Sequence, residues 1–241
     1  MSDFPPNLSI RPLTIEDLEQ CIELENKGFP EAERCTPEKL KYRLTTCPEL
    51  CSGLFIRQYG YKYNAVNLPE VAAKLEKERK DSPEKESEAG SKNEDDLAEV
   101  DDEDDDISYE KLPVKLSVVN ETLIGHIIAT KVYSNRITES SMKLPSAEDP
   151  TAGHIEQSRN IGVHGLVIDP KWQGKNLGTL LMHDYIQKLS NQDVGNKVVI
   201  IAHKELVPFY EKIGFVNHGE SECKFAGSSW FDMSIDLIAQ E

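Results

Sequence analysis

Residues 160–215 constrain the fold more than any other part of the chain. The segment NIGVHGLVIDP is apolar and ends in Asp-Pro, which predicts a strand that stops there. A polar loop containing Gly174 and Gly178 follows, and residues 177–190 have the apolar spacing of an amphipathic helix. KVVIIA then predicts a short buried strand, and ELVPFYEKIGF predicts a short helix that ends at Gly214. This strand–loop–helix–strand–helix order predicts the central unit of a mixed fold.

The flanking segments also alternate between helix and strand patterns. Thr14, with Asp17 three residues later, predicts the start of a helix that ends at Gly28. Thr36-Pro37 predicts the start of a second helix. Strand patterns occur at LSIRPL, CSGLFIRQY, KLSVVN and LIGHIIATKVY joined by a turn at Asn120-Glu121, FVNHGE and SWFDMSIDL. We therefore expect an α+β (mixed α/β) fold.

Acidic residues gather in one part of the sequence. Residues 81–106 hold fourteen Asp and Glu and two Lys, so −12 of the net charge of −16 lies there. The segment has almost no apolar side chains, so it cannot offset the entropy cost of ordering. We expect a single domain over residues 1–241, interrupted by a disordered acidic insertion at about 76–110. The insertion is a solvated loop, a docking segment for a basic partner, or an attractor of cationic substrates.

Charge and cysteine usage narrow the classes of partner. The net charge of −16 argues against nucleic acid and against an anionic membrane surface. No apolar run approaches the roughly 18 residues of a membrane span, and MSDFPPNLSI lacks the basic start and apolar core of a signal peptide. Five cysteines, an odd number, favour buried thiols in the reducing cytoplasm. Neither the Cys47–Cys51 spacing nor the scattered histidines (His126, His154, His183, His203 and His218) indicates a metal site.

The loop Gln173–Gly178 joins a predicted strand to a predicted helix. The first N–H groups of a helix have no internal partners and lie at the positive end of its dipole, so an anion fits there. Gly174 lets the backbone approach a ligand closely, and Lys175 adds a cation. By itself this pattern is typical of a phosphate-binding loop or of an ordinary turn. It is neither a Walker loop nor a dinucleotide fingerprint.

The loop and its surroundings resemble the coenzyme A site of the GNAT acetyltransferase superfamily. The loop pattern there is Q/R-x-x-G-x-G/A, and Gln173–Gly178 matches it except at Asn176, where glycine is usual. Asn is the non-glycine residue that most readily adopts a positive φ, so the loop is still expected to close. The helix with FYEKIGF, after a short strand, is a second mark of the superfamily.

A narrower resemblance concerns the arylalkylamine, or serotonin, N-acetyltransferases. It rests on TTCPELCSGLF, GHIEQSRNIGVHGLVIDP and LVPFYEKIGF, and it covers nearly all of the chain outside the acidic segment. It implies a twisted mixed sheet, flanked by helices and splayed between its fourth and fifth strands, in a protein that is monomeric. It also implies transfer of acetyl from acetyl-CoA to small arylalkylamines or, as in fungal relatives, to polyamines.

The resemblance also implies roles for particular residues. Tyr210 matches the tyrosine that protonates the leaving thiolate, and a phenol with a pKa near 10 suits an acid at neutral pH. Phe29 and Pro37 would be apolar contacts of a mobile loop over the amine. Cofactor contacts are expected from two sets: the strand backbone that would pair with the pantetheine arm (Leu166, Val167, Ile168) and the loop that would hold the pyrophosphate (Gln173, Gly174, Lys175, Asn176, Leu177, Gly178, Thr179).

The base that takes the ammonium proton has several candidates. His164 can accept a proton directly or through water, but the second histidine of the vertebrate enzymes is replaced here by Gly162. Glu25, and next Glu31 or Glu33, are alternatives, because insect relatives use a glutamate in this region. The alternative without catalysis is that His164 is a hydrogen-bonded core residue and that the three acids lie on solvent-exposed helix ends.

Two other functions compete with small-amine acetylation. The first is acetylation of protein lysines or N-termini, with the acidic insertion docking a basic tail. The second is a non-enzymatic module that binds a basic partner through residues 81–106.

Overall fold

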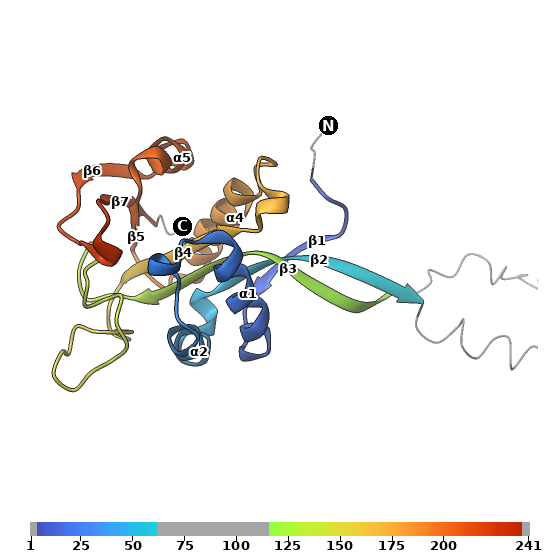
Figure 1. Ribbon diagram of the computed structural model, residues 1–241, viewed down its shortest axis with the longest axis horizontal. Helices are drawn as coiled ribbons and strands as arrows, with labels where there is room; N and C mark the ends of the chain where they lie inside the picture. The colour runs from blue at the N-terminus through green and yellow to red at the C-terminus, as the bar shows by residue number, and fades with distance from the viewer. Residues whose placement is uncertain (1–3, 62–115, 238–241) are drawn as a thin grey trace, which may run out of the picture. The chain divides into compact units, whose positions relative to one another are not determined.

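The computed structural model describes residues 4–61 and 116–237 (Figure 1). The acidic insertion expected at about 76–110 lies outside the described residues. The chain divides into one compact unit of residues 1–57 and 121–241 and a second of residues 58–120. The first unit contains the α+β core and all the site residues discussed below. No helix in the described ranges is both long and apolar enough to cross a membrane.

Within residues 4–61 and 116–237, seven strands form one open sheet in the order β1-β2-β3-β4-β5-β7-β6. Most neighbouring strands are antiparallel, and β4 and β5 are parallel, so the sheet is mixed as expected. The strands are β1 (Leu8–Pro12), β2 (Ser52–Tyr61), β3 (Leu116–Lys131), β4 (Asn160–Ile168), β5 (Lys197–Ala202), β6 (Val216–Glu220) and β7 (Phe231–Asp236).

Helices cover both faces of the sheet, and the alternation of strand side chains explains why. Neighbouring strand residues point to opposite faces, so Leu54 and Phe55 enter different apolar clusters, and so do Val167 and Ile168. One cluster packs against α1 (Leu18–Gly28) and α2 (Pro37–Thr46). The other packs against α4 (Leu177–Gln192) and α5 (Val207–Ile213).

Local sequence signals set the helix ends. Thr36 caps α2, its hydroxyl accepting the Lys39 N–H at 3.4 Å, and proline follows at the first helical position. α5 ends at Gly214, whose φ of 112° suits glycine. At the N-terminus, Asp17 accepts the Thr14 N–H at 2.8 Å, and a short 3₁₀ turn precedes α1.

One predicted boundary is wrong. The sequence indicated two strands joined by a turn at Asn120-Glu121, but β3 runs through this point without interruption. Glu121 is held there by Arg11 Nε at 3.0 Å and Arg57 Nε at 2.7 Å. These contacts with β1 and β2 fix Glu121 in the sheet, and the pair lacks the glycine that a tight hairpin turn favours.

The parallel strands β4 and β5 pair only at their beginnings. The paired positions are Asn160–Gly162 with Lys197–Val199. Beyond them β4 continues beside β3 to Ile168, while β5 continues beside β7 to Ala202. The sheet therefore splits between its fourth and fifth strands, as the resemblance implied, and the split creates the space in which the candidate site lies.

Candidate active site

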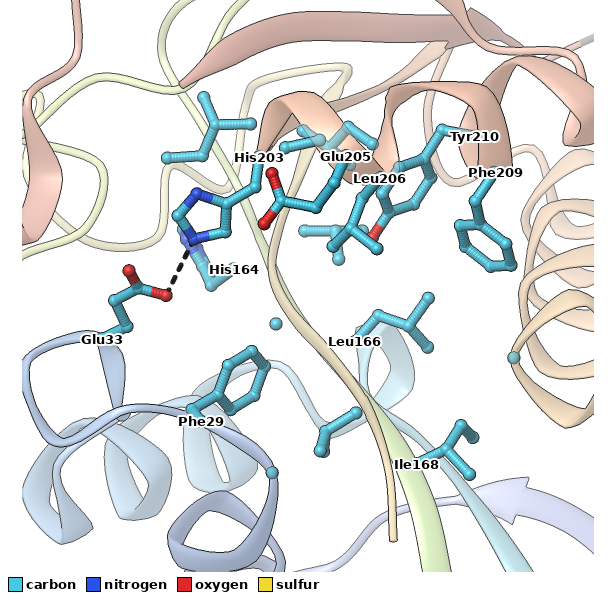
Figure 2. A pocket seen from close by; sticks show the side chains of 18 of the residues that line it. Phe29, Glu33, His164, Leu166, Ile168, His203, Glu205, Leu206, Phe209 and Tyr210 are labelled. Carbon is cyan, nitrogen blue, oxygen red and sulfur yellow. Dashed lines mark hydrogen bonds and ion pairs between the residues drawn. The ribbon is translucent and has the colours of Figure 1, made fainter. Parts of the chain in front are cut away.

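A cavity of about 690 Å³ occupies the split between β4 and β5 (Figure 2). β4, the loop that follows it and the start of α4 line one part, and the end of β5 with α5 lines another. Phe29, Phe225 and Trp230 add aromatic walls. The lining includes the carboxylates of Glu33 and Glu205 and, within the described part of the chain, no Lys or Arg. The cavity therefore has the charge and apolar surface that suit an organic cation.

The loop before α4 has the backbone form that a phosphate-binding loop requires. Asn176 adopts a left-handed conformation with φ 58°, and Gly174 has φ 76°, so asparagine does fill the position where glycine is usual. The Gln173 side chain donates from Nε2 to the Ile168 carbonyl at 3.0 Å, which ties the loop to β4. The first bond into the helix runs from the Leu180 N–H to Asn176 O at 3.0 Å, so the amides before it are free for a ligand.

Most of the residues expected to contact the cofactor line the cavity. They are the β4 residues Leu166, Val167 and Ile168 and the loop residues Gln173, Gly174, Asn176, Leu177, Gly178 and Thr179. Lys175 is not among the lining residues. The loop therefore presents its backbone to the cavity, and an anion there would be bound mainly by amides and the helix dipole.

Tyr210 lies on α5 with 8% of its surface exposed. Edge-on contacts with Phe209 and Phe215, at ring-centroid distances of 4.9 and 5.5 Å, fix its ring. Its hydroxyl points into the cavity (Figure 2). Burial raises the pKa of Tyr210 above its ordinary value, so the phenol keeps its proton at neutral pH. A protonated phenol at this point can act as an acid toward a group in the cavity.

His164 lines the cavity but is chemically a poor proton acceptor. Its Nε2 lies 2.7 Å from Thr130 Oγ1, and its Nδ1 lies 3.1 Å from Met142 Sδ. Burial, and then the charges of Arg43 and Lys39, lower the pKa of His164 well below its ordinary value. The imidazole is therefore neutral, and it gains little by accepting a proton.

Glu25 is brought close to the cavity without lining it. The side chain is 3% exposed and lies behind β4, where its Oε1 is 2.9 Å from His126 Nε2 and its Oε2 accepts the Cys35 N–H at 2.9 Å. In the sequence, His126 is one of several scattered histidines that do not indicate a metal site. Its proximity to Glu25 depends on packing between α1 and β3, which no local pattern predicts.

The part of the cavity near Glu33 has two lining residues that the sequence did not single out, His203 and Trp230. His203 follows β5, stacks on Trp230 at 4.0 Å between ring centroids, and places Nε2 3.1 Å from Glu33 Oε2 (Figure 2). One feature of the sequence could have indicated that His203 faces a site. His203 comes directly after the buried strand KVVIIA, at a strand end where side chains often face a site.

The segment that was expected to contact the amine lines the cavity only in part. Phe29 lines the cavity, whereas Pro37 is exposed at the first position of α2 and does not reach it. Glu31 is exposed, while Glu33 lines the cavity and also accepts the Ser228 hydroxyl at 3.2 Å. Of the two later acids proposed as bases, only Glu33 reaches the cavity.

The described residues contain no cluster of three or more His, Cys, Asp or Glu that could hold a metal ion. All five cysteines are free; four are buried and Cys35 is partly buried, as expected for structural thiols.

The open mixed sheet, its split, and the helix N-terminus beside the split define an α+β protein with a split-sheet architecture. The chain belongs to the GNAT acetyltransferase family: residues 103–237, more than half of the chain, match the acetyltransferase (GNAT) domain.

Two curated relatives give the level of similarity. The chain is 27% identical over 115 residues to an uncharacterised N-acetyltransferase of Pyropia yezoensis, over 46% of this chain and 60% of that protein. It is 28% identical over 115 residues to the serotonin N-acetyltransferase of Mesocricetus auratus, over 48% of this chain and 51% of that protein. The matches thus span little more than half the length of these relatives.

Solved structures support the fold. The loading GNATL domain of CurA from Lyngbya majuscula aligns with a TM-score of 0.56 at 13% identity, covering 95% of this chain and 98% of that one. The GphF GNAT-like decarboxylase in complex with isobutyryl-CoA aligns with a TM-score of 0.55 at 13% identity, covering 95% and 99%. At these identities the likeness establishes the fold alone.

Proposed function

We propose that the protein transfers the acetyl group of acetyl-CoA to the primary amine of a small arylalkylamine or polyamine. The products are an N-acetylamine, free coenzyme A and one proton. The observation that carries the proposal is the left-handed Asn176 loop at the start of α4, which opens into the same cavity as the Tyr210 hydroxyl. One element suits a diphosphate, and the other suits a leaving thiolate.

The cofactor assignment draws on geometry and on family. The amides that precede the first bond of α4, with Gly174 and Asn176, are the groups that would hold the pyrophosphate. The pantetheine arm would lie along Leu166–Ile168, where β4 has lost β5 as a partner. The GNAT-like decarboxylase with the same fold was solved with an acyl-CoA, which favours this placement.

The amine assignment rests on charge and shape. Glu33 and Glu205 supply negative charge, and Phe29, Phe225 and Trp230 supply flat apolar surface. Both features suit an ammonium group on an aromatic or methylene chain. The resemblance to a serotonin N-acetyltransferase points the same way. Tyr210 is the proposed acid, and His164 and Glu25 are the candidate bases.

Steady-state assays on the full chain test the proposal. Purified protein is incubated with acetyl-CoA and, separately, tyramine, tryptamine, serotonin, putrescine, spermidine, spermine and a lysine-rich peptide, and free thiol and N-acetyl product are both measured. We expect equal amounts of the two products with at least one small amine. Turnover of the peptide alone would favour a protein acetyltransferase. Thiol release no faster than hydrolysis with every acceptor would overturn the proposal.

A further inference from the structure

A second, much smaller cavity adjoins the main one and has basic residues in its wall. It measures about 10 Å³, the space of about one water molecule, and Arg34, Lys39 and Arg43 are among its lining residues. The two cavities share the lining residues Glu33, Met142, His164 and Phe225. Glu33 and His164 lie at one end of the main cavity (Figure 2). The basic residues therefore lie next to that end, behind the shared side chains.

Arg43 is a buried cation on α2. The residue is 3% exposed, and a guanidinium group keeps its proton in proteins. Within the described residues it has no ion pair, and its one side-chain hydrogen bond runs from Nη1 to Cys35 Sγ at 3.3 Å. Burial raises the pKa of Cys35 to about 11, so this thiol is neutral. A buried cation without a negative partner is costly, so an anion bound beside Arg43 would be strongly stabilised.

The carboxylates of this region contact other groups. The two oxygens of Glu33 and the two oxygens of Glu25 already lie 2.9–3.2 Å from other side chains or from a backbone N–H. Lys39 is half-buried and has no ion pair within the described residues; burial, and then the charge of Arg43, lower its pKa. Two basic groups thus lie close together at the small cavity, and no carboxylate of the described chain neutralises them.

This arrangement distinguishes between classes of acceptor. An acceptor whose only charges are ammonium groups is repelled by Arg43. An acceptor with both an amine and a carboxylate is attracted at both ends, because its ammonium can lie with Glu33 and Glu205 in the main cavity while its carboxylate approaches Arg43. A guanidinium can donate two parallel N–H bonds to a carboxylate. The small cavity has the space for one carboxylate oxygen in place of one water.

We propose that the acceptor carries a carboxylate as well as its primary amine, as an amino acid does, and that Arg43 binds this carboxylate with Lys39 beside it. The inference rests on the proposed function and narrows its acceptor to amines that bear an acid group. The reaction is otherwise the same. The amine nitrogen bonds the acetyl carbon, and the thioester C–S bond breaks. Of the two protons that the ammonium loses, one goes to the leaving thiolate and one to water.

Three pairs of acceptors that differ in the carboxylate test the proposal on the full wild-type chain. They are tyrosine with tyramine, tryptophan with tryptamine, and 4-aminobutyrate with butylamine. We expect kcat/KM to be about 10-fold higher, or more, for the acid of at least one pair, which corresponds to one hydrogen bond to a charged group. A wild-type protein that favours the acid in none of the three pairs would overturn the proposal.

Arg43→Met removes the charge and keeps an unbranched side chain. We expect the ratio of kcat/KM for the acid to that for the amine to fall about 10-fold or more. The thermal midpoint should not fall, because an apolar side chain replaces a buried cation without a counter-ion. Arg43→Lys keeps the charge without the planar fork and should retain part of the preference. Lys41→Met, an exposed change on the same helix, is the matched control and should keep the wild-type ratio. A wild-type ratio in folded Arg43→Met contradicts the proposal.

A binding measurement separates this inference from the proposed function. Calorimetric titration with N-acetyltyrosine and N-acetyltyramine, in the presence of CoA, requires no turnover. We expect the wild-type protein to bind N-acetyltyrosine about 10-fold more tightly and Arg43→Met to lose this difference. If these results hold but no amine is acetylated, the proposed function fails and the carboxylate site stands. If amines are acetylated and Arg43→Met changes neither ratio, the carboxylate site fails alone.

The last arm of the experiment distinguishes a carboxylate site from a general anion site. Sodium acetate should inhibit competitively with the favoured acid, whereas sodium chloride at the same concentration should not. Equal competition by acetate and chloride would show that Arg43 binds small anions without selecting a carboxylate, and it would overturn the assignment.

Discussion

The carboxylate of Glu33 and the imidazole of His203 meet at 3.1 Å although they are 170 positions apart in the sequence. Glu33 belongs to the 3₁₀ turn Glu31–Glu33 after α1, and His203 follows β5. The second Glu33 oxygen accepts the Ser228 hydroxyl at 3.2 Å. One side chain therefore joins three separate segments beside the cavity, and it fixes the loop that carries Phe29.

Replacing Glu33 with Gln should weaken this junction. The charge-assisted contact with His203 is lost, so we expect the KM for the amine to rise about 10-fold, the equivalent of one hydrogen bond to a charged group. The kcat should change much less, and the Kd for acetyl-CoA not at all. Steady-state kinetics with the best amine of the panel provide the measurement. Glu38→Gln, an exposed change nearby on α2, is the control. An unchanged KM in Glu33→Gln would show that the junction does not shape the amine site.

Asn176 can be tested by two substitutions with opposite expectations. Its φ of 58° is strained for most side chains, at about 1–2 kcal/mol, so Asn176→Ala should destabilise the protein by that amount and weaken CoA binding several-fold. Asn176→Gly should bind CoA as well as wild type, because glycine adopts this conformation freely. Calorimetric titration measures the Kd for CoA, and thermal unfolding measures the change in stability. Equal behaviour of the two variants would mean that the left-handed backbone at this position is unimportant.

Tyr210→Phe isolates the proposed acid. The hydroxyl has no hydrogen bond to the rest of the described chain, so removing it should leave the thermal midpoint nearly unchanged. Loss of a general acid should lower kcat about 100-fold with acetyl-CoA binding intact. Because burial raises the pKa of Tyr210, wild-type kcat should show no alkaline limb from this group below its ordinary pKa of 10.0. A kcat within threefold of wild type in Tyr210→Phe would exclude the acid role.

Asp17 predicts a pH dependence of stability. Burial alone would raise its pKa, but hydrogen bonds from Arg11 at 2.8 Å and from the Thr14 N–H outweigh burial and leave the pKa below 3.8. A depressed carboxyl pKa contributes stability that is fully present above pH 3.8 and is lost as the pH falls through the lower folded value. Asp17→Asn should therefore unfold more easily at pH 7, by about 1–2 kcal/mol, and the difference should shrink in acid.

Denaturant titrations at pH 7 and pH 3 measure this effect. Glu16→Gln, the exposed neighbour, should behave as wild type at both values. A constant difference between Asp17→Asn and wild type at the two pH values would rule out the linkage.

The sequence by itself determined the features that depend on near neighbours. Thr36-Pro37 begins α2 and Gly214 ends α5, because caps and turns are local interactions. The positive φ of Asn176 was predictable for the same reason: it depends on the residue's own side chain.

Only the tertiary structure decided which distant groups meet. The continuity of β3 at Glu121 depends on Arg11 and Arg57 in neighbouring strands, so a local turn pattern misplaced it. The Glu25–His126 and Glu33–His203 contacts arise from the packing of helices and loops on the sheet, across separations of 101 and 170 residues. Burial and charges supplied by other elements set the proton affinity of a side chain, and no sequence pattern contains them.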